Sequence, residues 1–522
     1  MSVILDKAKN NGIWIILFVA AVLRVYFYSG ISSADDLAIA EASLDLLEGG
    51  PYMPTGHYNA RLAMVYPLAG VFLLFGTGDW QMALLPMAAS LVTIGLTFLI
   101  AKRLFCWQVG ILAAAILAIF PLDVVLASRF VPDTYFGAYM TGAVYFALRA
   151  YDGGSKSLFY SLMAGLLWGA GYLVKIEAAF LLVPLLYLAW QNRALWRQSI
   201  CVAVGCFVFV GGENIIYWSQ TGHLFHRLSV VSATTVIKWN EAYSNTQLWV
   251  FPKAWFVTPY YFGLHYYLLF LGMFWWAFSK QKRLTFFVIW AGIYLVWLQF
   301  GFNPFTETVT FKSHLSRYCI GFGAPTAIII AVFLKNIFAD QQKLVPIFGG
   351  FWIVVSVILM AFNVLSNERE VASKIALAKF SGTPSDTIYM DNGTLGLATF
   401  LYRKHPMTDV ARSFQQHDFI TGKTRLVPVN EMDGYLILNR EFVRHRKNRY
   451  FMAGLNDETI INSCSEVLTI DNPAPKFSYF VARGIKKILL LMPLDTLKNK
   501  AKHTVDSVLA DRDVVIYDCR QS

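Results

Sequence analysis

The chain has 522 residues, of which 56% are hydrophobic and only 15% are charged, and its formal net charge at pH 7 is +11. Soluble proteins carry about 25% charged residues, so this composition excludes an ordinary soluble protein and predicts a polytopic α-helical membrane protein. Lys and Arg in cytoplasmic loops account for much of the positive charge, and no nucleic-acid partner is expected.

About eleven segments are apolar and long enough to cross a bilayer, which takes roughly 20 helical residues each. Lys7 and Lys9 precede the first span and predict a cytoplasmic N-terminus. The outer loop 31–79 follows, and its short apolar run 62–75 is predicted to lie on the outer membrane surface. This assignment places the Lys and Arg clusters of the later connections in the cytoplasm. The predicted spans are 13–28, 80–101, 108–126, 134–150, 158–174, 178–191, 199–217, 258–279, 284–302, 319–338 and 345–365.

The polar tail lies on the same outer side as the first loop in this topology. We therefore divide the chain into a transmembrane domain, residues 1–365, and a C-terminal α/β domain, residues 366–522. Cys464 and Cys519 belong to the tail and would be able to pair in an oxidising compartment. Alternating apolar residues predict strands at 387–390, 434–438 and 514–517, and a helical pattern covers 394–402.

Several ionisable residues gather at the outer ends of the predicted spans. Asp35 and Asp36 come directly after the first span, in a chain whose charges are otherwise sparse. Placing an ionisable group at membrane depth costs free energy, so its presence there indicates a function. Two acids and several bases at one interface suit an anionic, lipid-attached substrate. The other members of this set are Arg61, Arg129, Asp133, Lys175 and Arg317.

The order of these pieces resembles the GT-C superfamily of glycosyltransferases, and within it the protein mannosyltransferases and the aminoarabinose transferases that act on lipid A. The resemblance covers about residues 12–338 and implies a polyprenyl-phosphate-linked sugar donor, a lipid or glycan acceptor and no required cofactor. One departure is Arg61-Leu62-Ala63, where the family has a basic-Pro-Pro sequence. The matching pieces are Arg24 in the first helix, Asp35-Asp36, Arg61 to Phe75, Lys102 to Phe105, Ser128 to Asp133, Gly165 to Lys175, and Arg317-Tyr318.

The resemblance implies that Asp35 is the catalytic base, which would deprotonate an acceptor hydroxyl. Asp36 is then a capping or supporting neighbour. The alternative is that both acids only cap a helix, because Ser33-Ala34-Asp35-Asp36 is also a good helix start. Asp133 is the second acidic candidate, and it too is either functional or a capping residue. Arg129 would be able to pair with it as scaffolding.

The candidate substrate- and phosphate-binding residues are Arg61, Arg129, Lys175, Arg317 and Tyr318. Among them, Lys175 and Arg317 are the candidate phosphate ligands. A guanidinium fits phosphate oxygens in pairs, whereas a lysine at a helix end often only extends to the interface. Glu177 is a possible counter-charge for Lys175. Arg24 is expected to hold a loop acid or a carbonyl.

No metal is assigned, because His57 and His314 have no carboxylate or Cys near them in the sequence of the kind that a metal site needs. A divalent cation between Asp35 and the phosphate stays an alternative. The sequence therefore predicts an inverting glycosyltransferase of the bacterial inner membrane with its active site on the periplasmic face. Two other functions stay open, a flippase or transporter of a lipid-linked saccharide and a non-catalytic scaffold. Transporters of this kind usually contain two repeated halves, and the sequence shows no such repeat, which counts against the transporter.

Overall fold

The computed structural model divides the chain into two compact units, which are described separately. The first contains Met1–Tyr28, Ala42–Phe75 and Met82–Met360, and the second contains Ser29–Glu41, Gly76–Gln81 and Ala361–Ser522. Parts of the outer loop that the sequence assigns to the transmembrane domain therefore belong to the second unit. The structure describes residues 2–32, 35–49, 53–54, 56, 58–191, 196–231, 250–256, 261–279, 281–303, 310–311, 316–341, 343–367, 370–380, 386–403, 411–413, 415–417, 424–426, 432–439, 463–471, 475–490, 505–506 and 514–520.

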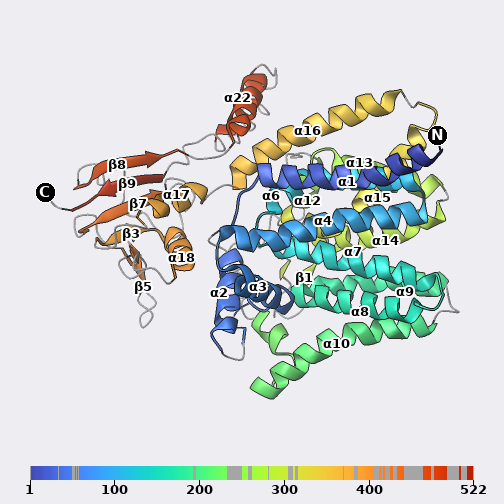
Figure 1. Ribbon diagram of the computed structural model, residues 1–522, viewed down its shortest axis with the longest axis horizontal. Coiled ribbons are helices and arrows are strands. Elements are labelled where there is room, and N and C mark those ends of the chain that lie inside the picture. Colours follow the sequence, from blue (N-terminus) through green and yellow to red (C-terminus); the bar gives the residue numbers. More distant parts are fainter. Residues whose placement is uncertain are drawn as a thin grey trace. The chain divides into compact units, whose positions relative to one another are not determined.

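The first unit is a helical bundle in which long helices run side by side (Figure 1). Prolines at the first helical positions of α6 and α7 suit these starts, because proline has the required backbone angle and lacks only an N–H that needs no partner there. Its elements are α1 (Ser2–Tyr26), α3 (Leu62–Phe75), α4 (Asp79–Leu104), α5 (Trp107–Ala118), α6 (Pro121–Leu126), α7 (Pro132–Tyr151), α8 (Ser157–Val174), η1 (Ile176–Leu181), α9 (Leu182–Gln191), α10 (Trp196–Thr221), α12 (Val250–Phe256), α13 (His265–Ser279), α14 (Lys282–Phe300), β1 (Phe302–Asn303), β2 (Thr310–Phe311), η4 (Ser316–Phe322), α15 (Gly323–Ile337) and α16 (Leu344–Asn367).

Each predicted span overlaps a helix, and the prediction of a polytopic helical membrane fold is confirmed. Within the described residues, six helices are long and apolar enough to cross a membrane. The count of eleven spans stays a prediction. The predicted span 108–126 is broken before Pro121 into α5 and α6.

Helices α8 and α10 pack backbone against backbone through small residues. A Cβ atom added to Gly205 of α10 would lie 2.6 Å from the Leu162 carbonyl oxygen of α8, and one added to Gly165 would overlap the Val202 carbonyl. Gly165 and Gly169 form a G-x-x-x-G pair, which in membranes allows two helices to approach closely.

A buried ion pair joins α1 to α6. The Arg24 guanidinium is completely buried and pairs with the Asp123 carboxylate, while Ser90 of α4 donates to the same Asp123 oxygen at 2.7 Å. Arg24 also donates to Ser90 Oγ at 2.8 Å and to the Ala20 carbonyl at 3.0 Å. Arg24 therefore holds a carbonyl, as expected, and its acidic partner is Asp123 of α6 rather than an acid of a loop.

The basic turns meet at the opposite end of the bundle. Arg283 Nη1 donates to the Leu104 carbonyl at 2.9 Å, and Lys335 Nζ donates to Cys106 Sγ at 3.1 Å. Arg103 pairs with the exposed Asp152. Arg103 and Lys335 lie in the last turns of α4 and α15, where a positive charge also complements the helix dipole.

The C-terminal part of the second unit is an α/β fold. Its five-stranded sheet has the order β4-β3-β7-β9-β8, with β3 parallel to β4 and β7, and β9 antiparallel to β7 and β8. The predicted strands are β3, β7 and β9. The elements are α17 (Val371–Phe380), β3 (Ile388–Met390), α18 (Asn392–Leu401), β4 (Ala411–Ser413), β5 (Gln415–His417), β6 (Thr424–Leu426), β7 (Tyr435–Asn439), β8 (Ser465–Ile470), α22 (Lys476–Leu490) and β9 (Val514–Asp518). Of the helices described, three have residues in both units: α2 (Asp35–Leu47), the start of α4 including Asp79, and the end of α16.

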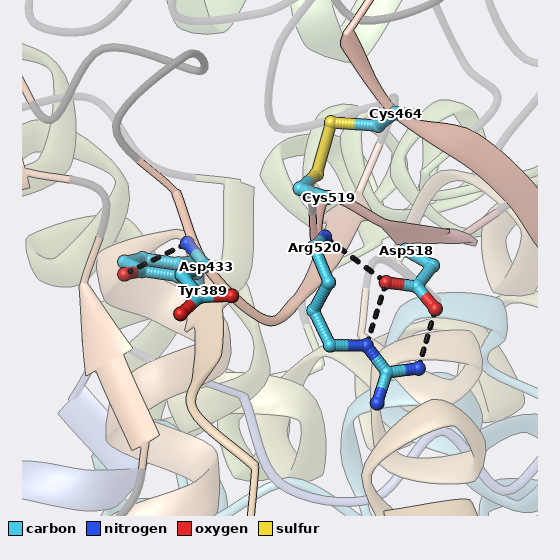
Figure 2. The surroundings of a disulfide bond; sticks show 6 residues. All are labelled: Tyr389, Asp433, Cys464, Asp518, Cys519 and Arg520. Atoms are coloured by element: carbon cyan, nitrogen blue, oxygen red, sulfur yellow. Dashed lines mark hydrogen bonds and ion pairs between the residues drawn. A yellow bond between two sulfur atoms is a disulfide. The ribbon is translucent and has the colours of Figure 1, made fainter. Parts of the chain in front are cut away.

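Cys464 and Cys519 form a disulfide (Figure 2). They flank Ser465 and Asp518, which are register partners on β8 and β9, so the strand pairing brings the two cysteines together. Arg520 extends from the same end and pairs with Asp518. The Arg520 guanidinium lowers the pKa of the partly exposed Asp518 carboxyl group.

We expect Gly205→Ala to lower the melting temperature of the detergent-purified protein, because overpacking a close helix contact costs about 1–3 kcal/mol. Gly212→Ala on the same helix is the matched control, since nothing lies within 4 Å of an added Cβ there. The control should leave the melting temperature unchanged or raise it. Equal melting temperatures for both variants would contradict the close packing of α8 and α10.

Asp123→Asn should sharply reduce the yield of folded protein in size-exclusion chromatography. It leaves the Arg24 guanidinium buried without its counter-charge, and breaking a buried ion pair costs about 3–5 kcal/mol. Asp152→Asn is the control, because the Asp152 side chain is 47% exposed and its loss should cost about 0–1 kcal/mol. Similar yields for the two variants would argue against the role of the Arg24–Asp123 pair.

Candidate functional site

Asp133 is a buried acid at the start of α7. Pro132 fixes the first helical residue, so the Asp133 side chain lies in the first turn, where the helix dipole favours a negative charge. The side chain is only 1% exposed. A carboxylate this deeply buried is stable only with a cation or several hydrogen-bond donors beside it.

Lys175 is the closest partner of Asp133 among the described residues. It follows α8 in an extended conformation, and its Nζ donates to Asp133 Oδ1 at 2.5 Å. The same Nζ lies 4.0 Å from the centre of the Tyr318 ring, in the geometry of a cation–π contact. The counter-charge of Lys175 is therefore Asp133, which the sequence analysis does not pair with it.

Arg317 approaches the other carboxylate oxygen. Its Nε lies 3.6 Å from Asp133 Oδ2, and its Cζ lies 5.9 Å from the Tyr318 ring centre. Helix η4 carries both Arg317 and Tyr318. Four residues that the sequence singles out thus form one group, which we call the Asp133 cluster. Its members are Asp133, Lys175, Arg317 and Tyr318.

The Asp133 cluster brings two cations to one buried carboxylate. One carboxylate faces two cations, and the carboxylate is sealed while the side chains of Lys175 and Arg317 are 10% and 22% exposed. In a poorly hydrated environment such cations attract an anion strongly. The cluster is therefore suited to hold a phosphate, and the buried Asp133 carboxylate would keep the two cations in position.

Arg129 and Arg61 lie at other helix ends. Arg129 is half-buried between α6 and α7, and its carbonyl accepts a hydrogen bond from the Val131 amide at 2.8 Å. Arg61 is half-buried directly before α3, and its Cζ lies 6.0 Å from the Tyr58 ring centre. The predicted binding roles of both residues stay predictions.

Asp35 and Asp36 belong to the second unit, in the first turn of α2. Both are buried, at 6% and 0% exposure. Asp36 Oδ2 accepts a hydrogen bond from the Ser32 amide at 3.0 Å, which joins the first turn of α2 to the chain that precedes it. The catalytic role of Asp35 stays a prediction.

A second buried ion pair, between Glu213 and Arg227, was not predicted from the sequence. Arg227 Nη1 lies 3.3 Å from Glu213 Oε2, and Arg227 Nη2 donates to the Leu173 carbonyl at 3.2 Å. Both side chains are at most 5% exposed. Glu213 stands inside the predicted span 199–217, and this position alone was a signal that a buried partner exists.

The described residues hold no group of three or more His, Cys, Asp or Glu side chains that could bind a metal ion. His57 and His314 lie outside the described residues.

The comparisons with known proteins agree with this architecture. Residues 62–218 match the model of the dolichyl-phosphate-mannose-protein mannosyltransferase family. No curated protein matches the chain. The chain is similar in structure to ArnT from Cupriavidus metallidurans in the apo state, with 14% identity and a TM-score of 0.57, over 98% of both chains.

A second ArnT structure from the same organism, bound to undecaprenyl phosphate, has 12% identity and a TM-score of 0.51 and covers 87% of this chain and 96% of that one. At these identities the likeness establishes the fold. The chain is therefore a multi-pass membrane protein with the fold of the ArnT structures, and its residues 62–218 match the mannosyltransferase family model.

Proposed function

We propose that the protein is an inverting glycosyltransferase that moves a sugar from a polyprenyl-phosphate donor to a hydroxyl of a cell-envelope glycolipid, glycan or protein. The Asp133 cluster is the observation that carries the proposal. It offers two partly accessible cations around one sealed carboxylate. This charge pattern suits a lipid phosphate, and the family match over residues 62–218 supports the same substrate class.

In the proposed reaction, an acceptor hydroxyl oxygen attacks the anomeric carbon while the bond from that carbon to the phosphate oxygen breaks. The phosphate leaves with an added negative charge, which Lys175 and Arg317 stabilise through charge-assisted hydrogen bonds. The hydroxyl proton goes to a carboxylate, and we assign this role to Asp35 from the order of motifs in the sequence. Attack from the side opposite the phosphate inverts the anomeric centre.

The undecaprenyl phosphate bound by the ArnT structure supports a polyprenyl phosphate as the partner of this chain, by analogy of fold. We assign the active site to the periplasmic face of a bacterial inner membrane. The Cys464–Cys519 disulfide supports this orientation for the C-terminal unit, because disulfides persist in oxidising compartments. The Lys and Arg turns at the end of the bundle with Arg283 and Lys335 support a cytoplasmic position for that end.

Loss of the proposed base should stop sugar transfer without stopping donor binding. We expect Asp35→Asn to reduce the initial rate of product formation at least about 100-fold, since general-base catalysis contributes about 10²–10⁴-fold. The measurement is mass spectrometry of envelope glycans formed in isolated membranes that contain the endogenous donor and acceptor. Transfer at the wild-type rate by Asp35→Asn would overturn the base assignment, and no product with the wild-type protein would overturn the proposed function.

Removing either partly exposed cation of the Asp133 cluster should weaken binding of undecaprenyl phosphate. We expect Lys175→Gln and Arg317→Gln each to raise the dissociation constant about 10- to 100-fold, as a hydrogen bond to a charged group contributes about 1.5–3 kcal/mol. Lys335→Gln, at the opposite end of the bundle, is the control and should bind normally. The measurement is thermal-shift titration in detergent, and unchanged affinity in both site variants would exclude this phosphate site.

A further inference from the structure

The backbone just before Asp35 is held by a carboxylate from a distant part of the loop. The Ile31 amide donates to Asp79 Oδ1 at 2.7 Å. Ile31 is almost fully buried, and Asp35 follows four residues later in the first turn of α2. The position of the segment 29–41 within the second unit therefore depends on Asp79.

The second carboxylate oxygen of Asp79 accepts a hydrogen bond from a lysine of the C-terminal fold. Lys374 Nζ donates to Asp79 Oδ2 at 2.7 Å, and the two side chains are only 11% and 20% exposed. This ion pair is better shielded from water than the Lys486–Asp506 pair of the same unit, where both side chains are 39% exposed. Shielding strengthens an ion pair and reduces its sensitivity to salt.

Lys374 is itself fixed by the sheet through its neighbour. Ser373 is fully buried in α17, and its hydroxyl accepts a hydrogen bond from Asn439 Nδ2 at 2.9 Å. Asn439 ends strand β7. Thr394 of α18 also contacts Ser373, at 3.3 Å. A continuous series of contacts thus runs from the central strands through α17 and Asp79 to the Asp35 segment.

Gly30 shows how closely these parts fit. Its φ is +69°, a backbone conformation that L side chains rarely adopt. A Cβ atom at this position would lie 2.6 Å from Asp79 Oδ2 and 2.7 Å from Lys374 Nζ. A second contact supports the same segment, because a Cβ at Gly396 of α18 would lie 3.1 Å from Leu37 Cδ1.

We propose that Asp79 and Lys374 are positioning residues, through which the C-terminal α/β fold sets the location of Asp35. This inference rests on the proposed function insofar as Asp35 is the base. It gives the C-terminal fold a task in the reaction, which is to hold the base in a reactive orientation. The competing interpretation is that the Asp79–Lys374 pair only adds stability to the second unit.

The test compares Lys374→Met with Lys374→Arg, and uses Lys486→Met as the matched control in the same unit. Lys374→Met removes the charge and keeps most of the side-chain volume, whereas Lys374→Arg keeps the charge. A base displaced by about 1 Å loses on the order of 100-fold in rate. We therefore expect Lys374→Met to slow product formation in isolated membranes about 10- to 100-fold, while undecaprenyl phosphate binds as in wild type. Lys374→Arg should restore most of the rate, and Lys486→Met should not change it.

Hydrogen exchange of the backbone amides provides a readout that does not depend on activity. We expect faster exchange over residues 29–41 in Lys374→Met and in Asp79→Ala, and wild-type exchange in Lys486→Met. Wild-type exchange and wild-type transfer in Lys374→Met would overturn the positioning role. A lower melting temperature with unchanged transfer would leave only a stabilising pair and would also overturn it. Failure of the proposed function is distinguished by a wild-type protein that forms no product.

Discussion

The cost of burying charge in an apolar helical bundle determines how this protein is assembled. Asp133 is sealed at the start of α7 and must have a counter-charge, which Lys175 supplies from the end of α8. Arg317 approaches the same carboxylate from η4. These ion pairs bring together the start of α7, the end of α8 and η4, which are distant in sequence. The proposed phosphate site lies where these three elements meet.

Other buried charges of the bundle meet the same requirement differently. Arg24 and Asp123 have side chains 1% and 6% exposed, and Glu213 and Arg227 are sealed to a similar degree. These are one-to-one pairs whose charges cancel. The Asp133 cluster differs because two cations share one carboxylate and keep some exposure. The partial exposure of these two cations is the reason to assign ligand binding to this cluster and stabilising roles to the other two pairs.

Local patterns explain how much could be predicted from the sequence. Apolar length predicted the helices, alternation predicted β3, β7 and β9, and the order of motifs selected Asp133, Lys175, Arg317 and Tyr318 before any distance was known. The partners of these residues were harder to predict from the sequence. Glu177 is two residues from Lys175, yet the observed partner is Asp133, 42 residues away. Helix packing decides such long-range pairs, and no periodicity in the sequence records it.

The roles of acids inside predicted spans show the same limit. Asp123 and Glu213 were counted within apolar segments, although an unpaired acid there would be unstable. Asp79 was assigned to the end of a loop, and its contacts with Ile31 and Lys374 depend on a C-terminal fold that begins almost 300 residues later. The sequence therefore predicts which residues carry chemistry better than it predicts which residues hold them in place.

A structure of the protein determined with bound undecaprenyl phosphate tests the central claim most directly. The account predicts that the phosphate oxygens lie within hydrogen-bond distance of Lys175 Nζ and the Arg317 guanidinium, with Asp133 still paired beneath them. A phosphate bound at the opposite end of the bundle, near Arg283 and Lys335, or away from both cations, would contradict it.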